Sequence, residues 1–440
     1  MAVSRVSRRS FGPFFYVVAL LIALVLTVRL SVFAVAGGQL SSYGLPSATM
    51  FGIDATHTPV PGMIQEPLDV HWTYDGGAVM NPVAVRGVVY GGTVTAPYMV
   101  VALNIKNGRP LWTTEMNNQV MTMPLVVGST VYVGTGNSLF AHVPVAGHSA
   151  VRGTGSSSLV ALSSKTGRIL WQDTTPGENM PTPVFWHGNL YAVGGSDQLM
   201  EINPATGQIM RTLAIPSYVS MSSPVVSHGL LYFGGAYPYN FYSVNLTQWS
   251  VQWSTLIPKA SGAVDDCPPL LAGNNVYTEA VKTTGGRNEF YAVDLNRTTG
   301  QIVWQKALGS GPLPFSASGR ASNESGIPVF HGGVLYLGSP ITKTLYALNA
   351  HTGAVLWSNG LNHQGITQAP LYVDGQLLVG DGGGTLWDVN AETGQVINKT
   401  AVGGAFMPSM PLLIGRTLLV GTRAPALDAL SMKTVAPSLR

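Results

Sequence analysis

From residue 68 onward, apolar and polar positions alternate in short runs that are separated by polar, glycine-containing turns. Alternation with a period of two is typical of β-strands, because successive side chains of a strand point to opposite faces. The clearest case is LYALNAHTGAVLW at residues 345–357, in which two apolar runs flank a tight turn at His351-Thr352-Gly353. This pattern predicts two antiparallel strands, the second of which ends at Trp357.

The same phrase returns along the chain, which makes an internal repeat the first feature to explain. The copies span residues 100–112, 159–171, 199–211, 241–253, 291–304, 345–357 and 386–398, with a truncated copy at 427–434. One copy, at 241–253, lacks the Thr-Gly pair, and we expect Met210 and Ile397 to stand where other copies carry the final tryptophan.

A second phrase precedes each copy and consists of a proline, two or three apolar residues, a short turn and another strand. The anchoring prolines are spaced by 41 to 59 residues and are Pro82, Pro124, Pro183, Pro224, Pro269, Pro328, Pro370 and Pro411. Eight units of about four short strands have the period of propeller blades. The sequence therefore predicts an all-β, eight-bladed β-propeller of four-stranded blades.

The last unit stops after residues 427–434 and lacks its final strand. The first recognisable strand, LDVHWTYD at residues 68–75, carries Trp72 and has no unit of its own. We therefore expect this N-terminal strand to close the ring, which would protect two open strand edges. The predicted organisation is a targeting segment at 1–36, a linker at 37–67 and the propeller at 68–440.

The targeting segment begins with Arg5, Arg8 and Arg9 and continues as an apolar run from residue 11 to 28. This pattern is typical of an exported protein whose arginines stay in the cytoplasm. SRRSF at residues 7–11 resembles a twin-arginine signal, so the Sec and twin-arginine routes both remain open. AVA at residues 34–36 fits a cleavage site, but the segment equally fits a retained anchor helix that contacts the membrane. In either case the propeller is expected to be periplasmic or extracellular.

Composition adds a hypothesis about the medium. Only 10% of the residues are charged, against a usual value of about 25%, and 20 are Asp or Glu. Carboxylates that are paired in the folded state lose their stabilising contribution when they protonate, so a chain with few of them loses little folding stability in acid. The composition therefore favours an acidic medium, although a hydroxyl-rich secreted surface is the competing interpretation. A net charge of +3 without a basic stripe argues against a nucleic-acid partner.

In a propeller, the residues just before each innermost strand surround the mouth of the central channel. Most of these segments are methionine-rich and neutral, with exceptions in three units. The exceptional residues are Glu178, Asp265, Asp266 and Glu324. Clustered carboxyl groups push their pKa values apart, which provides one proton donor and one base. We predict Asp266, Asp265 and Glu324 as catalytic; the alternative is that they cap turns or pair with Arg320 or Lys259.

Two insertions, at residues 136–158 and 306–322, exceed the repeat period and carry Arg152 and Arg320. Long insertions in a tight repeat are often functional. We predict that both arginines, together with Glu178, bind a small anionic substrate, the alternative being solvated arginines. His142 and His148 lack a convincing metal spacing, so no metal is predicted, and Cys267 is expected to be a buried thiol.

The repeat of alternating apolar residues, Thr-Gly and a terminal tryptophan resembles that of the quinoprotein-like β-propellers, over residues 68–440. The resemblance implies that the tryptophans dock between blades. It also raises pyrroloquinoline quinone (PQQ) as a candidate cofactor, because dehydrogenases of this family stack PQQ between a tryptophan and a disulfide of adjacent cysteines. This chain has one cysteine and no tryptophan in the channel segments, so it departs from that pattern and no cofactor is predicted.

Two other branches remain open. Outer-membrane assembly lipoproteins of this family are non-enzymatic scaffolds, although they carry a lipid-accepting cysteine that is absent here; a scaffold or accessory subunit implies protein partners or self-association. Tetrathionate hydrolases of acid-living sulfur oxidisers are exported, use no quinone and are thought to rely on an aspartate. GENMPTP at residues 177–183 and VDDCPP at 264–269 are similar to their pre-proline segments. This second resemblance implies that Asp266 activates water or moves a proton, that Asp265 or Glu324 tunes it, and that the methionines contact sulfur.

Overall fold

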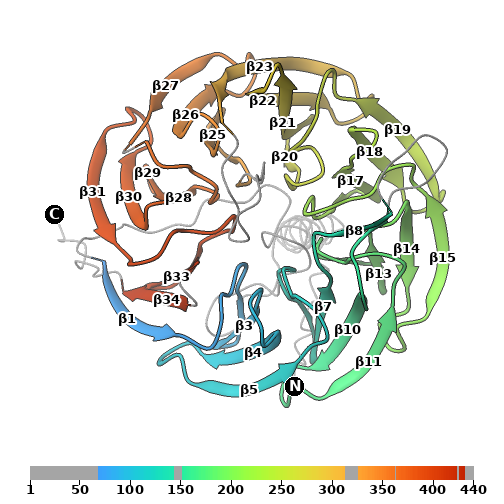
Figure 1. Cartoon of the computed structure of the whole chain (residues 1–440). Helices are drawn as coiled ribbons and strands as arrows, with labels where there is room; N and C mark the ends of the chain where they lie inside the picture. The colour runs from blue at the N-terminus through green and yellow to red at the C-terminus, as the bar shows by residue number, and fades with distance from the viewer. Residues whose placement is uncertain (1–67, 143–150, 313–325, 362, 424–425, 432–440) are drawn as a thin grey trace, which may run out of the picture. The chain divides into compact units, whose positions relative to one another are not determined.

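The computed structural model describes residues 68–142, 151–312, 326–361, 363–423 and 426–431. Eight antiparallel four-stranded sheets are arranged around a central axis (Figure 1), which confirms the predicted all-β propeller of eight blades. Within the described ranges no helix is present, so none is long and apolar enough to cross a membrane. The predicted targeting segment at 1–36 and linker at 37–67 lie outside the described residues.

The first four blades use the strands β2 to β7 and β10 to β19. Blade 1 consists of β2 (Val83–Val85), β3 (Val88–Gly92), β4 (Met99–Asn104) and β5 (Pro110–Glu115). Blade 2 consists of β6 (Leu125–Val127), β7 (Thr130–Thr135), β10 (Ser158–Ser163) and β11 (Ile169–Thr174). Blade 3 consists of β12 (Val184–Trp186), β13 (Asn189–Ala192), β14 (Gln198–Ile202) and β15 (Ile209–Ala214). Blade 4 consists of β16 (Val225–Ser227), β17 (Leu230–Gly234), β18 (Asn240–Asn245) and β19 (Ser250–Leu256).

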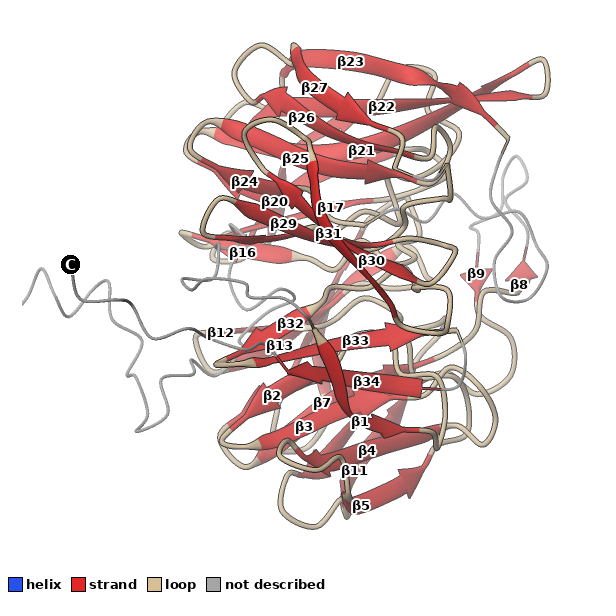
Figure 2. Cartoon of the chain, turned by 90° about the vertical axis from the view of Figure 1, so that its left-hand side faces the viewer, coloured by secondary structure: helices blue, strands red, loops and turns tan. Residues whose placement is uncertain are grey.

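The remaining blades follow in chain order, and a separate hairpin stands apart from the ring on one face (Figure 2). Blade 5 consists of β20 (Leu270–Ala272), β21 (Asn275–Thr284), β22 (Arg287–Asn296) and β23 (Ile302–Gly311). Blade 6 consists of β24 (Val329–His331), β25 (Val334–Ser339), β26 (Thr344–Asn349) and β27 (Val355–Asn359), and blade 7 of β28 (Leu371–Val373), β29 (Gln376–Gly380), β30 (Thr385–Asn390) and β31 (Val396–Ala401). Blade 8 consists of β32 (Leu412–Ile414), β33 (Thr417–Thr422), β34 (Ala426–Ser431) and β1 (Asp69–Tyr74), and the hairpin of β8 (Phe140–His142) and β9 (Val151–Arg152).

Burial follows the order of the strands within a blade. The third strand, for example β26, is buried at its four central positions, whereas the fourth strand, β27, alternates between exposed and half-buried residues. Each anchoring proline directly precedes an innermost strand, as the repeat predicts. In blade 8 the outer position belongs to β1, which pairs antiparallel with β34 from Asp69↔Ser431 to Tyr74↔Leu427.

The tryptophan that ends each repeat binds the turn of the following blade. The indole Nε1 of Trp304 donates a hydrogen bond of 3.0 Å to the Ala350 carbonyl, and the ring lies against Gly353. Asn349 shapes this turn by accepting hydrogen bonds from the His351 and Thr352 amides. Six such docks are described, with Nε1 to carbonyl distances of 2.8–3.1 Å, and their tryptophans are Trp72, Trp112, Trp171, Trp253, Trp304 and Trp357.

The strand register corrects one detail of the repeat. Arg211 pairs with Glu201 and Asn398 with Asp388, as Trp357 pairs with Ala347, so these residues rather than Met210 and Ile397 occupy the tryptophan position. At the junction of blades 3 and 4, where Arg211 stands in place of the docking tryptophan, Trp249 of blade 4 donates from Nε1 to the Thr212 carbonyl at 3.2 Å. Its ring also packs against the Arg211 guanidinium, 4.1 Å from the ring centroid, which restores a cross-blade contact.

Three blades carry a buried acid where other blades have a small residue. Glu201, Asp294 and Asp388 occupy one position of the third strand, and each accepts a hydrogen bond from an amide side chain on the second strand. For Asp294 the donor is Asn275, at 2.6 Å. Burial raises the pKa of Asp294 to about 7, partly offset by this hydrogen bond. The neutral acid is thus the form that the fold prefers.

We predict that Asp294→Asn stabilises the protein near pH 7 and has little effect near pH 3. The unfolded-state pKa is about 3.9, so the stabilisation from binding a proton is complete below pH ~4 and is lost as the pH rises through 7. The neutral amide removes that loss, and we expect a gain of about 2–4 kcal/mol in unfolding free energy at pH 7.5. Urea unfolding at both pH values measures it, with the exposed Asp374→Asn as control. Equal stability of Asp294→Asn and wild type at pH 7.5 would contradict the assignment.

A second prediction concerns the docked turn. Gly353 has φ +68° and a Cβ there would lie 2.8 Å from Trp304, whereas Gly375 has φ +86° and open space around it. Both alanine variants carry a left-handed backbone cost of about 1–2 kcal/mol, but only Gly353→Ala also displaces a docked indole, at about 1–3 kcal/mol more. Thermal unfolding of the two variants isolates this second contribution, and equal melting temperatures would rule it out.

Candidate active site

Among the described residues, the acids that break the methionine pattern come from blades 3 and 5. Asp265 and Asp266 precede β20 of blade 5, and Glu178 precedes β12 of blade 3. Arg152 is the last residue of β9, in the hairpin inserted into blade 2. The structure thus brings together four of the six predicted site residues. The other two, Arg320 and Glu324, lie outside the described residues.

Arg152 is buried against the acids rather than solvated. Its Nη1 lies 2.9 Å from Glu178 Oε1, with 12% and 0% of the two side chains exposed, and Nη1 also donates to the Ser220 hydroxyl. The main chains are joined as well, because the Glu178 amide donates to the Arg152 carbonyl at 2.9 Å and the Arg152 amide to the Gly195 carbonyl at 2.8 Å. The hairpin is therefore fixed to blade 3 by backbone and side chain together.

Glycine is required where this strand meets blade 3. A Cβ at Gly195 would lie 2.1 Å from the Arg152 carbonyl oxygen and 2.8 Å from the Glu178 side chain. Only the absence of a side chain allows the two backbones to approach and places the guanidinium beside the carboxylate.

The two aspartates are held by their backbone. The Asp265 carbonyl accepts hydrogen bonds from the Ser220, Met221 and Ser222 amides at 3.2, 2.8 and 2.7 Å, which ties blade 5 to blade 4. The Asp266 amide donates to the Ala263 carbonyl at 3.0 Å. Asp265 is 5% exposed and Asp266 9% exposed, so both carboxyl groups are largely removed from water.

The electrostatics of this cluster favour a protonated Asp265. Burial raises the pKa of Asp265 well above its ordinary value, and Asp266 and Glu178 raise it further, while Arg152 opposes them. For Arg152, burial alone would lower the pKa, but Glu178, Asp266 and Asp265 raise it above the usual value. The cluster therefore holds a permanent cation beside a carboxyl group that keeps its proton in acid.

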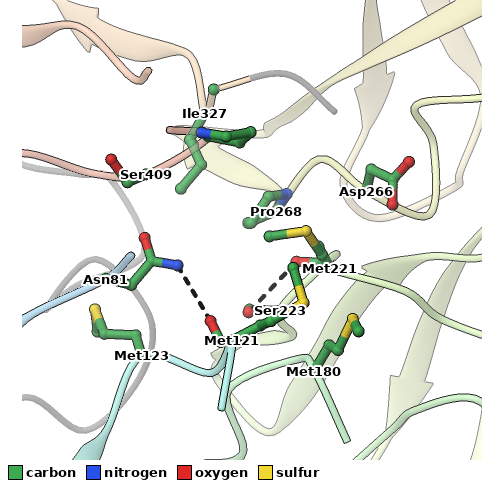
Figure 3. Close-up of a pocket in the computed structure, with 12 residues that line it drawn as sticks. Asn81, Met121, Met123, Met180, Met221, Ser223, Asp266, Pro268, Ile327 and Ser409 are labelled. Carbon is green, nitrogen blue, oxygen red and sulfur yellow. Dashed lines mark hydrogen bonds between the residues drawn. The ribbon is translucent and has the colours of Figure 1, made fainter. Parts of the chain in front are cut away.

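Asp266 also reaches the central channel. A small pocket, partly open to solvent, is lined there by Met121, Met123, Met180 and Met221 together with proline, isoleucine and small polar residues. Figure 3 shows Asp266 at the edge of this pocket, near Pro268 and Met221. Asn81 lies across it and donates from Nδ2 to the Met121 carbonyl at 3.4 Å.

Several residues of the site were not predicted. Ser220 contacts Arg152 and the Asp265 carbonyl, the Tyr218 ring lies 6.0 Å from the Arg152 guanidinium, and Tyr239 packs against the cluster of Tyr218 and Ala236. Glu279 of β21 is fully buried beside Cys267, at a position that is glycine in most blades. This departure from the repeat could have identified Glu279 from the sequence. Cys267 itself is a buried free cysteine, as expected. Across the described ranges, no group of three or more His, Cys, Asp or Glu side chains could hold a metal ion.

Removing one partner of the buried ion pair is expected to leave an uncompensated charge. We predict that Arg152→Met or Glu178→Gln alone lowers the unfolding free energy at pH 6 by about 3–5 kcal/mol. The double variant should recover a large part of this loss. As a matched control, Arg211→Met breaks the Arg211–Glu201 pair, in which Arg211 is 44% exposed, and should cost less. Additive losses in the double variant would argue against a coupled pair.

Together, the ring of Trp-docked blades and the match to the family model define an eight-bladed quinoprotein-like propeller. Within this class, the chain belongs to the family whose model is described as outer membrane protein assembly factor BamB. That model matches residues 67–306 and 288–434.

Two kinds of protein are similar to this chain in sequence. Tetrathionate hydrolase of Acidithiobacillus ferrooxidans is 29% identical over 299 residues, which cover 64% of this chain and 58% of that protein. Outer membrane protein assembly factor BamB of Yersinia pestis is 26% identical over 300 residues, covering 66% of this chain and 68% of that protein. Among solved structures, a europium-containing methanol dehydrogenase superposes with a TM-score of 0.66 at 11% identity, covering 88% of this chain and 98% of the other.

Proposed function

We propose that this chain is an exported hydrolase that cleaves the S–S bond of a polythionate such as tetrathionate in an acidic medium. The observation that carries the proposal is the buried Asp265–Asp266 pair facing the buried Arg152, at the edge of a methionine-lined pocket. The similarity to tetrathionate hydrolase over 299 residues supports it. The predicted targeting segment and the scarcity of carboxylates support export to an acidic medium.

In this mechanism, Asp266 accepts a proton from the attacking water, because it lines the pocket and faces Arg152. The water oxygen forms a bond to one sulfur of the substrate as the S–S bond breaks. The electron pair of that bond leaves with the other sulfur, which takes up a proton from neutral Asp265. The hydroxyl group of water thus stays on the first sulfur, and one net proton passes from water through the aspartate pair to the second sulfur, so the step needs no oxidant or reductant. Glu324 is proposed to tune the pair from the following blade.

Substrate binding is assigned to Arg152 and Arg320, with Glu178 orienting the Arg152 guanidinium. Soft thioethers of the pocket methionines provide polarizable contacts to the sulfur chain. A dianion would be repelled by ionised Glu178, Asp265 and Asp266 around one arginine. Protonation of Asp265 reduces that repulsion, so turnover should be greatest in acid.

A quinone of the dehydrogenase kind does not fit this chain. Stacking PQQ against a disulfide of adjacent cysteines is impossible with a single cysteine, and Cys267 is fully buried. The described pocket lining is methionine, proline, isoleucine and small polar residues instead of an aromatic platform. We therefore assign no step to a quinone.

We predict that tetrathionate turnover rises as the pH is lowered from 7 and falls again in strong acid, where the base Asp266 becomes protonated. Asp266→Asn should reduce kcat by about 100- to 10,000-fold, as for loss of a general base. Asp265→Asn should also be impaired and should lose most of the rise of kcat from neutral pH toward acid. The control is Asp294→Asn, which removes another buried acid of blade 5 away from the site. Absence of turnover at every pH would refute the hydrolase, and unchanged turnover in both aspartate variants would refute only their roles.

A non-enzymatic envelope scaffold is the second candidate, and two observations favour it. The relative from Yersinia pestis is an assembly factor, and apolar side chains are exposed on the outermost strands, including Leu111 and Leu356 at 54% each. Exposed apolar positions on edge strands suit a protein partner or a second copy. The turnover assay separates this candidate from the hydrolase.

A further inference from the structure

Three tyrosines near the acid cluster are not explained by the repeat. Buried tyrosines of the second strands, such as Tyr132 and Tyr277, donate their hydroxyl to a carbonyl of the following blade at 3.2 Å and are part of the inter-blade packing. Tyr218, Tyr237 and Tyr239 instead occupy the segment before blade 4 and the turn between β17 and β18. The repeat therefore does not account for these three tyrosines.

These rings form a continuous series from the surface to the Arg152 guanidinium. Tyr237 is 52% exposed and Phe140 of β8 is 36% exposed, whereas Tyr218 behind them is 6% exposed. The Tyr218 ring centroid lies 5.4 Å from that of Phe140 and 5.9 Å from that of Tyr237, and Tyr237 lies 5.4 Å from Tyr239. The series therefore joins the inserted hairpin to the blade 4 turn.

The inner end of the series meets the charged groups. The Arg152 guanidinium lies 6.0 Å from the Tyr218 ring centroid. Burial raises the pKa values of Tyr218 and Tyr239, and the Asp265 carboxylate raises both further. The Tyr218 phenol therefore stays protonated beside the Arg152 guanidinium, and Tyr239 packs against the cluster of Tyr218 and Ala236.

The outer end is held in a conformation that folding alone does not favour. Tyr237 has φ +53°, in the left-handed region that aromatic residues rarely adopt. Ser217 fixes this turn by donating to the Pro238 carbonyl at 2.8 Å, and the Ala236 amide donates to the Tyr218 carbonyl at 2.9 Å. An exposed aromatic ring held in this way, directly above buried donors, is typical of a binding site.

We propose that Tyr218 and Tyr239 complete, with Arg152, the wall that binds a sulfonate oxyanion of the substrate, and that Tyr237 and Phe140 form the entrance to this wall. The inference deepens the proposed hydrolase by naming its oxyanion donors, and it rests on that function for the identity of the substrate. Neutral phenols suit this role because they donate to a sulfonate without adding charge to a buried cluster.

The test uses the full chain and a non-hydrolysable probe, dithionate, a dianion with two sulfonate groups. Calorimetry at pH 3 measures its dissociation constant, and steady-state kinetics with tetrathionate measures KM and kcat. Tyr218→Phe and Tyr239→Phe keep the rings and remove only the hydroxyls. Each should weaken dithionate binding about 10- to 100-fold, the range for a lost hydrogen bond to an anion, and raise KM. Tyr237→Ser, at an exposed position, should raise KM by about tenfold and leave kcat within twofold.

The matched control is Tyr232→Phe, another buried tyrosine of blade 4, whose hydroxyl contacts the Arg297 carbonyl at 3.5 Å. It should bind dithionate and turn over tetrathionate as the wild type does. Wild-type binding in Tyr218→Phe and Tyr239→Phe, or no dithionate binding by the wild type, would overturn the wall. Dithionate binding that depends on the phenols, without any turnover, would support the wall and refute the hydrolase. Normal tetrathionate turnover, with wild-type dithionate binding in Tyr218→Phe and Tyr239→Phe, would support the hydrolase and overturn the wall.

Discussion

The docking of one indole onto the turn of the next blade is the contact on which the propeller depends. A four-stranded sheet cannot bury both of its faces alone, so each blade needs a neighbour at a fixed distance and angle. The tryptophan provides this through an Nε1 hydrogen bond and a ring seated on the turn glycine, as Trp304 does on Gly353. Trp72 of β1 makes the same contact with the first blade, through the Ile105 carbonyl. Where Arg211 replaces the indole, Trp249 supplies a ring from the opposite side of the junction.

The fixed positions of the blades also determine where the acidic residues lie at the channel. The segments before the innermost strands are tied to one another by polar side chains near the anchoring prolines. Thr122 donates to the Asn179 carbonyl at 3.0 Å and Ser222 to the Cys267 carbonyl at 2.9 Å. These two bonds hold the segments that carry Glu178 and Asp266. The neutral hydroxyl side chains of the channel segments thus hold the acids in position.

Much of this organisation could be predicted because each blade repeats the same pattern of packing residues. The eight blades and the carboxyl groups that break the methionine pattern follow from sequence periodicity, and the docking of the tryptophans between blades follows from the family resemblance. The partner of those acids does not, because Arg152 lies in an insertion whose position depends on backbone contacts with Gly195 and Glu178. Tyr218 and Tyr239 were missed for a related reason: an aromatic residue in a pre-strand segment looks like ordinary core until its neighbours are known. The register at Arg211 failed because a polar residue can occupy an indole position when its guanidinium stacks on another ring.

Acid links the stability of the fold to the proposed chemistry. Asp294 in the blade interior and Asp265 at the channel are both buried where the neutral carboxyl group is favoured. For such groups the folded state binds protons more tightly than the unfolded chain, so lowering the pH stabilises the fold where an ordinary ion-paired carboxylate would destabilise it. The same protonation removes a negative charge from the surroundings of Arg152 and leaves a proton donor beside it. Protonation of Asp294 and Asp265 thus favours the folded state in acid, and on the proposed function it also favours the binding of a dianionic substrate.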